Sequence, residues 1–451
     1  MNKNLKIILL ALMATSFLGV EARAQQSDTL TLNLQSAIDI ALSESPTVKV
    51  ANKEIERVDY SKKSAWYSVF PSLEASGQFS KYYVPAKMSM MGQVMDSPAD
   101  FNAQGSLQLS LPLFAPALWH TISMSELDIQ LAVEKAHASK ITLCNDVTKA
   151  YYNVLLAQDS YLALKSGYAL AEEVYNQAQK RFELGLAAQY DAISAEVQMK
   201  NLQPNLLEVE NGIEQAKMLL KVLIGLDVAL PLKITGNLSD FENEIIERNS
   251  LQVLSADNNT DLRQMDIQKK QLEKGLQLQF SQRLPTLAAF GTYGYAGTGN
   301  KETTMNFGEM PILVEKSKEW FSQGLLVGVQ LNVPLTGIFT NTAKEKQIKI
   351  QLQQLDLQRD YLKNSIDVQL RTAQNNMDKA AKQSEAAKKN VQLSQKGYDI
   401  AAKRYENGMG TVIELQNASL ALTQAYLAYN QAIATYLTAK SDLDKLLGKE
   451  K

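Results

Sequence analysis

The chain has 451 residues, with 46 Lys and Arg against 48 Asp and Glu and a formal net charge of −2. This balance gives no electrostatic basis for nucleic-acid binding, which requires clustered positive charge. Its single cysteine, Cys144, cannot form an intramolecular disulfide, so packing alone must hold the fold together.

The first residues have the pattern of a secretory signal peptide. Lys3 and Lys6 precede a short apolar run, and Ala22-Arg23-Ala24 matches the small-x-small cleavage pattern. A membrane anchor is the alternative, but the run is shorter than the ~20 apolar residues of a spanning helix. We therefore expect cleavage of residues 1–24. No later stretch is apolar over the length of a spanning helix, and an exported chain of this kind is soluble, peripheral or a β-barrel.

The next part of the chain predicts helices interrupted by two strands. Strict alternation of apolar and polar residues is typical of strands with two different faces. A Met-rich loop is expected between the strands, over 85–101. In chain order, the expected elements are a helix over 34–67, strands over 72–80 and 104–111, a long helix over 119–183 and a shorter helix over 190–223.

The remainder repeats this order. Gly-rich loop residues are expected between its two strands, up to about Gln323. The expected elements are a helix over 261–283, strands over 286–295 and 325–333, a long helix over 342–406 and a last helix over 411–447.

The repetition extends to individual residues. Arg181-Phe182-Glu183-Leu184-Gly185 recurs as Arg404-Tyr405-Glu406-Asn407-Gly408, and the same shift carries Asp191 onto Glu414. A repeat this long indicates a duplicated half-protein rather than a solenoid, whose periods run roughly 20–50 residues. The predicted domains after the signal peptide are therefore two repeats, 25–240 and 241–451.

The helices suggest an extended architecture. A long helix of about 65 residues would span about 100 Å, and the two shorter helices of the first half would match it end to end. Apolar residues at steps of four and three, such as Ile348, Leu352 and Leu355, suit coiled-coil packing. An ordinary helical bundle fits this stripe equally well.

The four strands are each about ten residues long, which matches the ~9–11 residues needed to cross a bilayer. Four strands cannot close a barrel around a water-filled pore, so several chains would have to pool them. A small soluble β-domain with one buried face is the alternative.

Together these features resemble the TolC-like family of outer-membrane efflux and secretion channels. The resemblance covers about 30–448 and rests on the order and spacing of motifs in two copies. These motifs are the two Arg-aromatic-Glu-x-Gly turns, each followed six residues after its glycine by an acid, the Pro-led strands at 70–73 and 284–287, and the strand ends at 111–114 and 333–335.

The resemblance implies a mainly α protein with a small antiparallel β part. Its duplicated halves would supply long coiled-coil helices to a periplasmic α-barrel. Four strands per chain would join a trimeric transmembrane β-barrel in the outer membrane of a Gram-negative bacterium. The implied function is the exit duct of a tripartite efflux or type I secretion system. The implied partners are further copies in a homotrimer, a periplasmic adaptor, an inner-membrane pump and outer-membrane lipid.

The resemblance also implies a periplasmic gate at the helical turns, formed by Tyr405, Glu414 and Asp191. Two departures bear on this gate, because Gly410 stands where some relatives have an arginine and Asn417 where some have a second aspartate. The alternatives are that Glu414 is a first-turn acid favoured by the helix dipole and that Tyr405 serves packing alone.

The same turns are where the family meets its adaptor. The positions implied for this contact are Arg181, Gly185, Leu186, Arg404, Gly408 and Met409. The two glycines also have a purely structural explanation, because they permit a positive φ at the helix ends.

No enzymatic chemistry is indicated. His120 and His137 stand alone, whereas a metal site or catalytic triad needs more partners. No phosphate-binding loop precedes a helix, so we expect neither an activity nor a cofactor. The methionines of 85–101 could bind a soft metal, but a mobile surface loop is preferred. The rival functions are a periplasmic coiled-coil adaptor or structural protein and an exported enzyme; the sequence does not identify a cargo.

Overall fold

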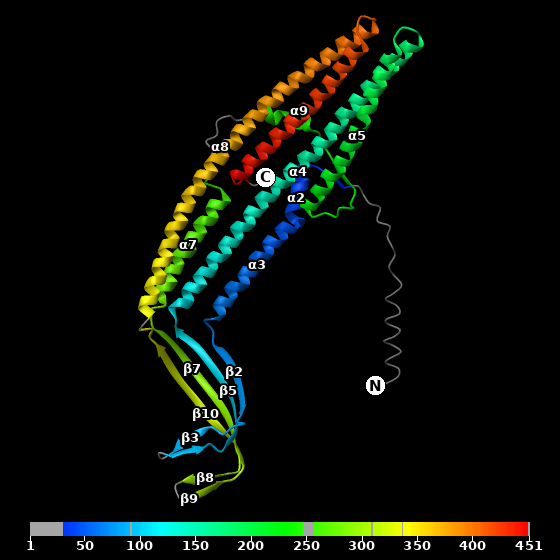
Figure 1. The fold of residues 1–451 in the computed structure, drawn as a ribbon. Helices are drawn as coiled ribbons and strands as arrows, with labels where there is room; N and C mark the ends of the chain where they lie inside the picture. Colours follow the sequence, from blue (N-terminus) through cyan, green and yellow to red (C-terminus); the bar gives the residue numbers. More distant parts are fainter. Residues whose placement is uncertain (1–29, 91–92, 247–256, 308–309, 336, 450–451) are drawn as a thin grey trace, which may run out of the picture. The chain divides into compact units, whose positions relative to one another are not determined.

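A computed structural model describes residues 30–90, 93–246, 257–307, 310–335 and 337–449 (Figure 1). The predicted signal peptide lies outside these residues. The chain divides into two compact units, and each contains parts of both predicted repeats. The helical unit comprises the described parts of Met1–Ser45, Asp146–Asn249 and Met377–Thr438, and the sheet unit those of Pro46–Asn145, Ser250–Asn376 and Ala439–Lys451. The repeat boundaries themselves stay a prediction.

The sheet unit contains the four predicted strands, joined in one antiparallel sheet of order β10-β7-β5-β2 (Figure 1). All four are longer than their alternating segments, β2 by one residue, because pairing continues beyond the clear alternation. The strands are β2 (Ser72–Lys81), β5 (Ala99–Phe114), β7 (Thr286–Asn300) and β10 (Ser317–Asn332).

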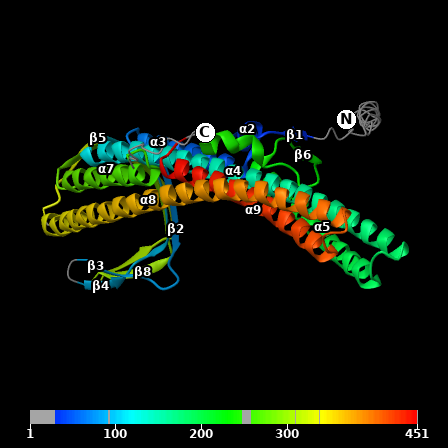
Figure 2. The same ribbon diagram turned by 90° about the horizontal axis from the view of Figure 1, so that it is seen from above.

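The loops expected between these strands each contain a short hairpin that the sequence analysis did not predict. The Met-rich segment holds a hairpin of β3 (Lys87–Met90) and β4 (Gln93–Asp96). The Gly-rich segment holds a hairpin of β8 (Thr303–Phe307) and β9 (Met310–Val314). The hairpins lie together at the end of the sheet away from the helices (Figures 1 and 2). Strands of four or five residues carry too little alternation to be distinguished from loops.

The helix expected over 34–67 is in fact two helices, α2 (Leu34–Glu44) and α3 (Pro46–Tyr67). Between them Ser45 has φ −57° and ψ 131°, which is not helical. A proline disfavours the helical conformation in the residue before it, whereas the proline itself is well placed at the first position of a helix. Pro46 therefore ends one helix and begins the next.

The remaining long helices agree with the periodic pattern to within about five residues. No helix among the described residues has the length and apolar character needed to cross a membrane. The helices are α4 (Pro116–Glu183), α5 (Gln189–Ile224), α7 (Thr260–Ser281), α8 (Gly337–Glu406) and α9 (Val412–Leu446).

The helical unit also contains short elements that the sequence did not predict. Strand β1 (Leu30–Leu32) pairs in parallel with β6 (Leu232–Ile234), and a 3-10 turn, η1 (Leu238–Phe241), leads into α6 (Glu242–Ile246). Side chains of α4 hold this segment, because Asp159 accepts a 2.8 Å hydrogen bond from the Leu238 amide and the Tyr151 hydroxyl donates to Thr235 O at 2.5 Å.

One structural device occurs in both halves of the sequence. Gly225 ends α5 with φ 79°, and Gly448 follows α9 with φ 67°. A Cβ at Gly225 would lie 2.6 Å from the carbonyl oxygen of Glu44, and one at Gly448 would collide with the backbone of Asn258. Each glycine therefore permits a left-handed helix end. Each also permits close contact with a backbone segment that precedes another helix, α3 for Gly225 and α7 for Gly448.

Candidate functional site

The two helix-to-helix turns of the helical unit have the same backbone geometry. Gly185 and Gly408 have φ values of 70° and 72°. The Leu186 amide donates to Arg181 O, and the Met409 amide donates to the O of Arg404, both at 2.8 Å. This is the hydrogen bond that closes a helix ending in a left-handed glycine. The repeated sequence therefore produces two equivalent turns.

Arg181 of the first turn reaches the second. Its Nη2 donates to the carbonyl oxygens of Tyr405 and Glu406, at 2.5 and 2.8 Å. Its guanidinium carbon also lies 4.4 Å from the centroid of the Tyr405 ring. These carbonyls belong to the last turn of α8, where helical partners are lacking and a cation is favoured. Arg181 therefore joins the two helical hairpins, α4–α5 and α8–α9, by a hydrogen-bonded cation–π contact.

Tyr405 lies in the core between the hairpins and is only 4% exposed. Burial raises the pKa of its hydroxyl; Arg181 lowers it and Asp191 raises it further. The hydroxyl oxygen is buried and has no hydrogen-bond partner among the described residues. Within one chain, then, Tyr405 packs rather than facing solvent. It shares one buried hydrophobic cluster with Val174, Ala178, Ala195, Val412 and Leu415.

Glu414 and Arg404 form an ion pair within the second turn, with Nη2 to Oε2 at 3.7 Å. Arg404 also donates to Met409 O at 3.2 Å. A Cβ at Gly410 would lie 3.2 Å from the Arg404 Cβ and 3.3 Å from Glu414 Oε2. The glycine at this position therefore leaves room for the pair. Asp191 is in the first turn of α5, and no hydrogen bond or ion pair joins it to Glu414 among the described residues.

The turns expose apolar side chains. Leu186 and Met409, which the sequence marked, are 73% and 67% exposed. Leu184 and Tyr190 are equally exposed and were not marked, although their apolar character beside the turn glycine was a usable signal. Clustered exposed apolar residues indicate an interaction surface. Arg181, by contrast, is half-buried and acts between the hairpins.

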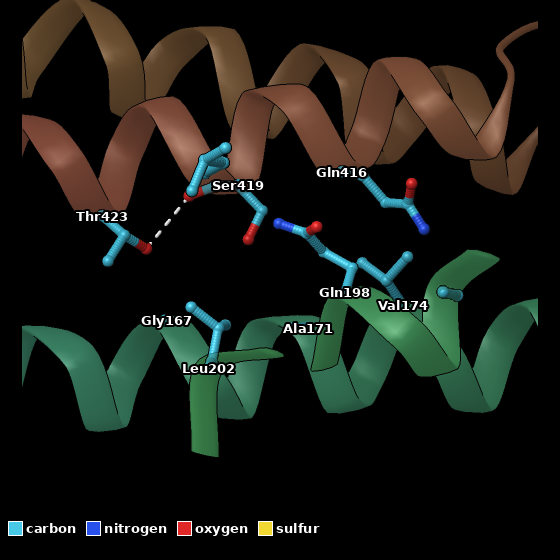
Figure 3. A pocket seen from close by; sticks show the side chains of 10 residues that line it. Gly167, Ala171, Val174, Gln198, Leu202, Gln416, Ser419 and Thr423 are labelled. Carbon is cyan, nitrogen blue, oxygen red and sulfur yellow. Dashed lines mark hydrogen bonds between the residues drawn. The ribbon is translucent and has the colours of Figure 1, made fainter. Parts of the chain in front are cut away.

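A pocket between the two helical hairpins is lined by small, apolar and polar side chains of α4, α5 and α9 (Figure 3). Gly167 of α4 faces Thr423 of α9 so closely that a Cβ would collide with its side chain. Thr423 donates a 3.1 Å hydrogen bond to Ser419 O, and the Gln416 Nε2 is buried without a partner among the described residues. The hairpins thus meet through a close but incompletely hydrogen-bonded seam.

The register of the sheet unit separates its side chains by chemistry. Leu73, Leu109, Gly291 and Val327 occupy one row across the four strands, and the next residues along give the row Glu74, Gln108, Thr292 and Leu326. Successive residues of a strand face opposite sides, so one face is predominantly apolar and the other predominantly polar. On the polar face, Ser76 and Ser106 are hydrogen-bonded across strands at 2.8 Å.

The apolar face is nevertheless exposed, since Leu325, Val327 and Leu331 are each more than 60% accessible. Aromatic rings gather near the outer end of the sheet, where Trp320 stacks with Tyr295 at 6.4 Å between centroids. An outward apolar band with aromatic residues at its margin is the pattern of strands in an outer membrane. The fold and its surfaces thus define a class, a membrane-inserted channel with a long helical portion.

Comparison with known proteins identifies the family. Residues 37–226 and 251–449 match the family described as outer membrane efflux protein. The chain is 23% identical over 350 residues to the outer membrane protein TolC of Vibrio cholerae, covering 76% of each chain. It is 27% identical over 214 residues to the probable efflux pump outer membrane protein TtgC of Pseudomonas putida, covering 45% of this chain and 43% of that protein.

Solved structures share the fold. The Campylobacter jejuni CmeC outer membrane channel superimposes with a TM-score of 0.69 at 18% identity, over 92% of this chain and 85% of that one. CusC gives a TM-score of 0.72 at 15% identity, over 92% of each chain. Both comparisons support the predicted combination of an α-barrel and a β-barrel.

The chain belongs to the outer membrane efflux protein family. It is a TolC-like exit duct of an efflux system in the outer membrane of a Gram-negative bacterium, with an adaptor and a pump as partners. It is a transport protein rather than an enzyme. The predictions of family, of the α-barrel and β-barrel fold class, of function as an efflux exit duct and of location are confirmed, and the homotrimer stays a prediction.

Proposed function

We propose that the duct is a homotrimer whose periplasmic turns form both its gate and its adaptor contact. The observation that carries the trimer is the open sheet of the single chain. Strands β2 and β10 are its edges, and neither has a second partner strand in the described chain. Unpaired strand edges are too costly to leave in lipid. Twelve pooled strands would remove every edge.

The helices of the sheet unit support pooling as well. Ile350, Leu357, Tyr361 and Val368 of α8 are each at least 54% exposed and recur at steps of seven and four. This spacing is that of a coiled-coil seam, which buries such residues against a second helix. Because α8 follows edge strand β10 and α3 precedes edge strand β2, α3 of a neighbouring copy is the helix we expect beside it.

The turns supply the gate in this proposal. Asp191 and Glu414 give each chain two acids, and Tyr405 with Arg181 holds the hairpins that carry them. Arg404 moderates the charge of Glu414 through its ion pair. The exposed residues beside Gly185 and Gly408, chiefly Leu186 and Met409, supply the apolar surface for the adaptor. The cargo would be passed on by an inner-membrane pump.

The decisive experiment is the native mass of the protein extracted from outer membranes in detergent. We expect a particle of three chains that is not released by osmotic shock. A monomer released without detergent would instead favour the rival function, a periplasmic coiled-coil protein. To test the paired edges, chains carrying single cysteines in β2 and β10 can be mixed in a Cys144→Ala background. Disulfide-linked pairs that form only in the mixture support the closed sheet.

A further inference from the structure

The sheet that forms the duct has an uneven distribution of charge. Its four strands carry five charged side chains: Glu74, Lys81, Asp100, Lys318 and Glu319. All but Glu74 lie at the outer end of the sheet, beside the β3–β4 and β8–β9 hairpins. Glu74 is seven residues from Lys81 along β2, or roughly 23 Å at 3.3 Å per residue. It is therefore the single charged residue in the part of the sheet nearer the helices.

The register assigns Glu74 to the polar face. Its cross-strand neighbour is Gln108, and Ser76 on the same face pairs with Ser106. The positive side chains lie on the other face, since Lys81 pairs with Phe101, and Lys318 with Gly299. The apolar residues belong against lipid, so the face of Glu74 lines water. The two charged residues that the register places on that face, Glu74 and Glu319, are both acidic, and Asp100 lies at the register shift between Ala99 and Phe101.

The carboxylate of Glu74 is free to act on a passing ion. Its side chain is exposed, and no Lys, Arg or His lies within ion-pair distance of it among the described residues. Two other acids of the chain are partly neutralised, because Glu414 lies 3.7 Å from Arg404 and Asp100 lies 3.5 Å from Lys301. Sheet closure brings β10 beside β2, and the end of β10 nearer the helices offers Gln330 and Asn332, which are uncharged.

We propose that Glu74 is the charge-selecting residue of the barrel. This inference rests on the trimer proposed above, in which three copies of Glu74 form a ring inside the pore. A ring of carboxylates in a confined pore raises the local concentration of cations and opposes anions. The duct then favours small cations and cationic organic solutes at a point far along the chain from the acids of the turns.

The test measures ion selectivity in planar lipid bilayers. Reversal potentials under a KCl gradient give the permeability ratio of K⁺ to Cl⁻ for the full-length protein. We expect Glu74→Gln to lower this ratio by about twofold or more, with a stronger effect at low salt because screening is weaker. Glu302→Gln, which removes an acid between the outer strands, is the matched control and should leave the ratio as in the wild type.

A second measurement separates charge from damage to the fold. Glu74→Cys in a Cys144→Ala background places one thiol on the proposed pore face. Reaction with a negatively charged methanethiosulfonate should restore cation preference, and a positively charged reagent should reverse it. An unchanged potential after both reactions, with modification verified by mass, would overturn the assignment.

The outcome is distinct from that of the proposed function. Selectivity that responds only to Asp191→Asn with Glu414→Gln, and not to Glu74→Gln, would overturn the role of Glu74 and leave the duct intact. A wild-type protein that remains monomeric and opens no pore would overturn both.

Discussion

The guanidinium of Arg181 lies over the ring of Tyr405 and donates to the carbonyl oxygen of the same residue. One side chain therefore fixes both the backbone and the ring of its partner. Because Arg181 extends from the end of α4 and Tyr405 lies in the last turn of α8, this contact joins the two hairpins close to their turns. Its strength bears on how readily the hairpins separate.

We expect Arg181→Lys to lower the free energy of unfolding by about 1–3 kcal/mol, because lysine lacks the planar guanidinium that donates through Nη2 to two carbonyls while lying over the Tyr405 ring. Thermal or denaturant unfolding in detergent measures this loss. Arg404→Lys is the matched control at the equivalent, exposed position.

Tyr405→Phe removes a buried hydroxyl that has no partner among the described residues, so it should leave stability unchanged or raise it. A large loss in Tyr405→Phe would contradict the packing described here.

Gly225→Ala and Gly185→Ala compare two glycines of positive φ in different surroundings. Both alanines pay about 1 kcal/mol for the left-handed conformation. At Gly185 no atom would lie within 4 Å of the new Cβ, whereas at Gly225 the Glu44 carbonyl oxygen would lie 2.6 Å away. We expect Gly225→Ala to cost about 1–3 kcal/mol more than Gly185→Ala in unfolding experiments. Equal losses would mean that α2 can shift freely.

We expect low pH to weaken the contact of α6 with α8 and α9, which Glu242 makes through Lys388 and Tyr429. Burial raises the pKa of this carboxyl, but hydrogen bonds from Lys388 and Tyr429 outweigh burial and hold the pKa below its usual 4.5. A carboxylate with a lowered pKa in the folded state stabilises it above the pKa of the unfolded chain. That stability is lost as pH falls through the folded pKa.

Thermal unfolding measured between pH 7 and pH 3 checks this expectation. Glu242→Gln should lower the melting temperature at neutral pH and reduce its decline in acid. Glu385→Gln, which removes an exposed acid of the same pocket, is the control and should follow the wild type. Parallel pH profiles for wild type and Glu242→Gln would exclude a role for this carboxylate.

The gate assignment predicts a change in conductance rather than in stability. Glu414→Gln combined with Asp191→Asn removes two acids per chain at the turns and also releases Arg404 from its ion pair. We expect weaker block by divalent cations and an altered open probability in lipid bilayers. Glu183→Gln, an exposed acid beside the first turn, should behave as the wild type. Channel behaviour identical to wild type would remove the gate role from both acids.

Periodicity alone was enough to predict the long helices and the four main strands, because each carries many repeats of its own spacing. The short strands β1 and β6 are three residues each, too few for a period, and they exist only because they pair with one another. The break at Ser45 was readable from Pro46, because a proline disfavours the helical conformation in the residue before it.

The sequence predicted where the candidate site at the helical turns lies in the chain, but not which of its residues contact one another. The duplicated turns identified Arg181 and Tyr405 separately, yet nothing in their spacing joins the arginine of one repeat to the tyrosine of the other. That contact depends on how the hairpins pack in three dimensions. Likewise, alternation predicted two faces for the sheet, and only the register between strands isolates Glu74 on the polar one.

The two open edges of the sheet also bear on biogenesis. In the proposed trimer the sheet is completed only by copies of itself. A single chain would then have no stable place in lipid, so membrane insertion and assembly would be one event. A subunit able to pair through β2 but not through β10 would bind one neighbouring chain and leave a strand edge of the other neighbour unpaired. Such subunits would act dominantly when co-expressed, inactivating channels in excess of their own share of the pool.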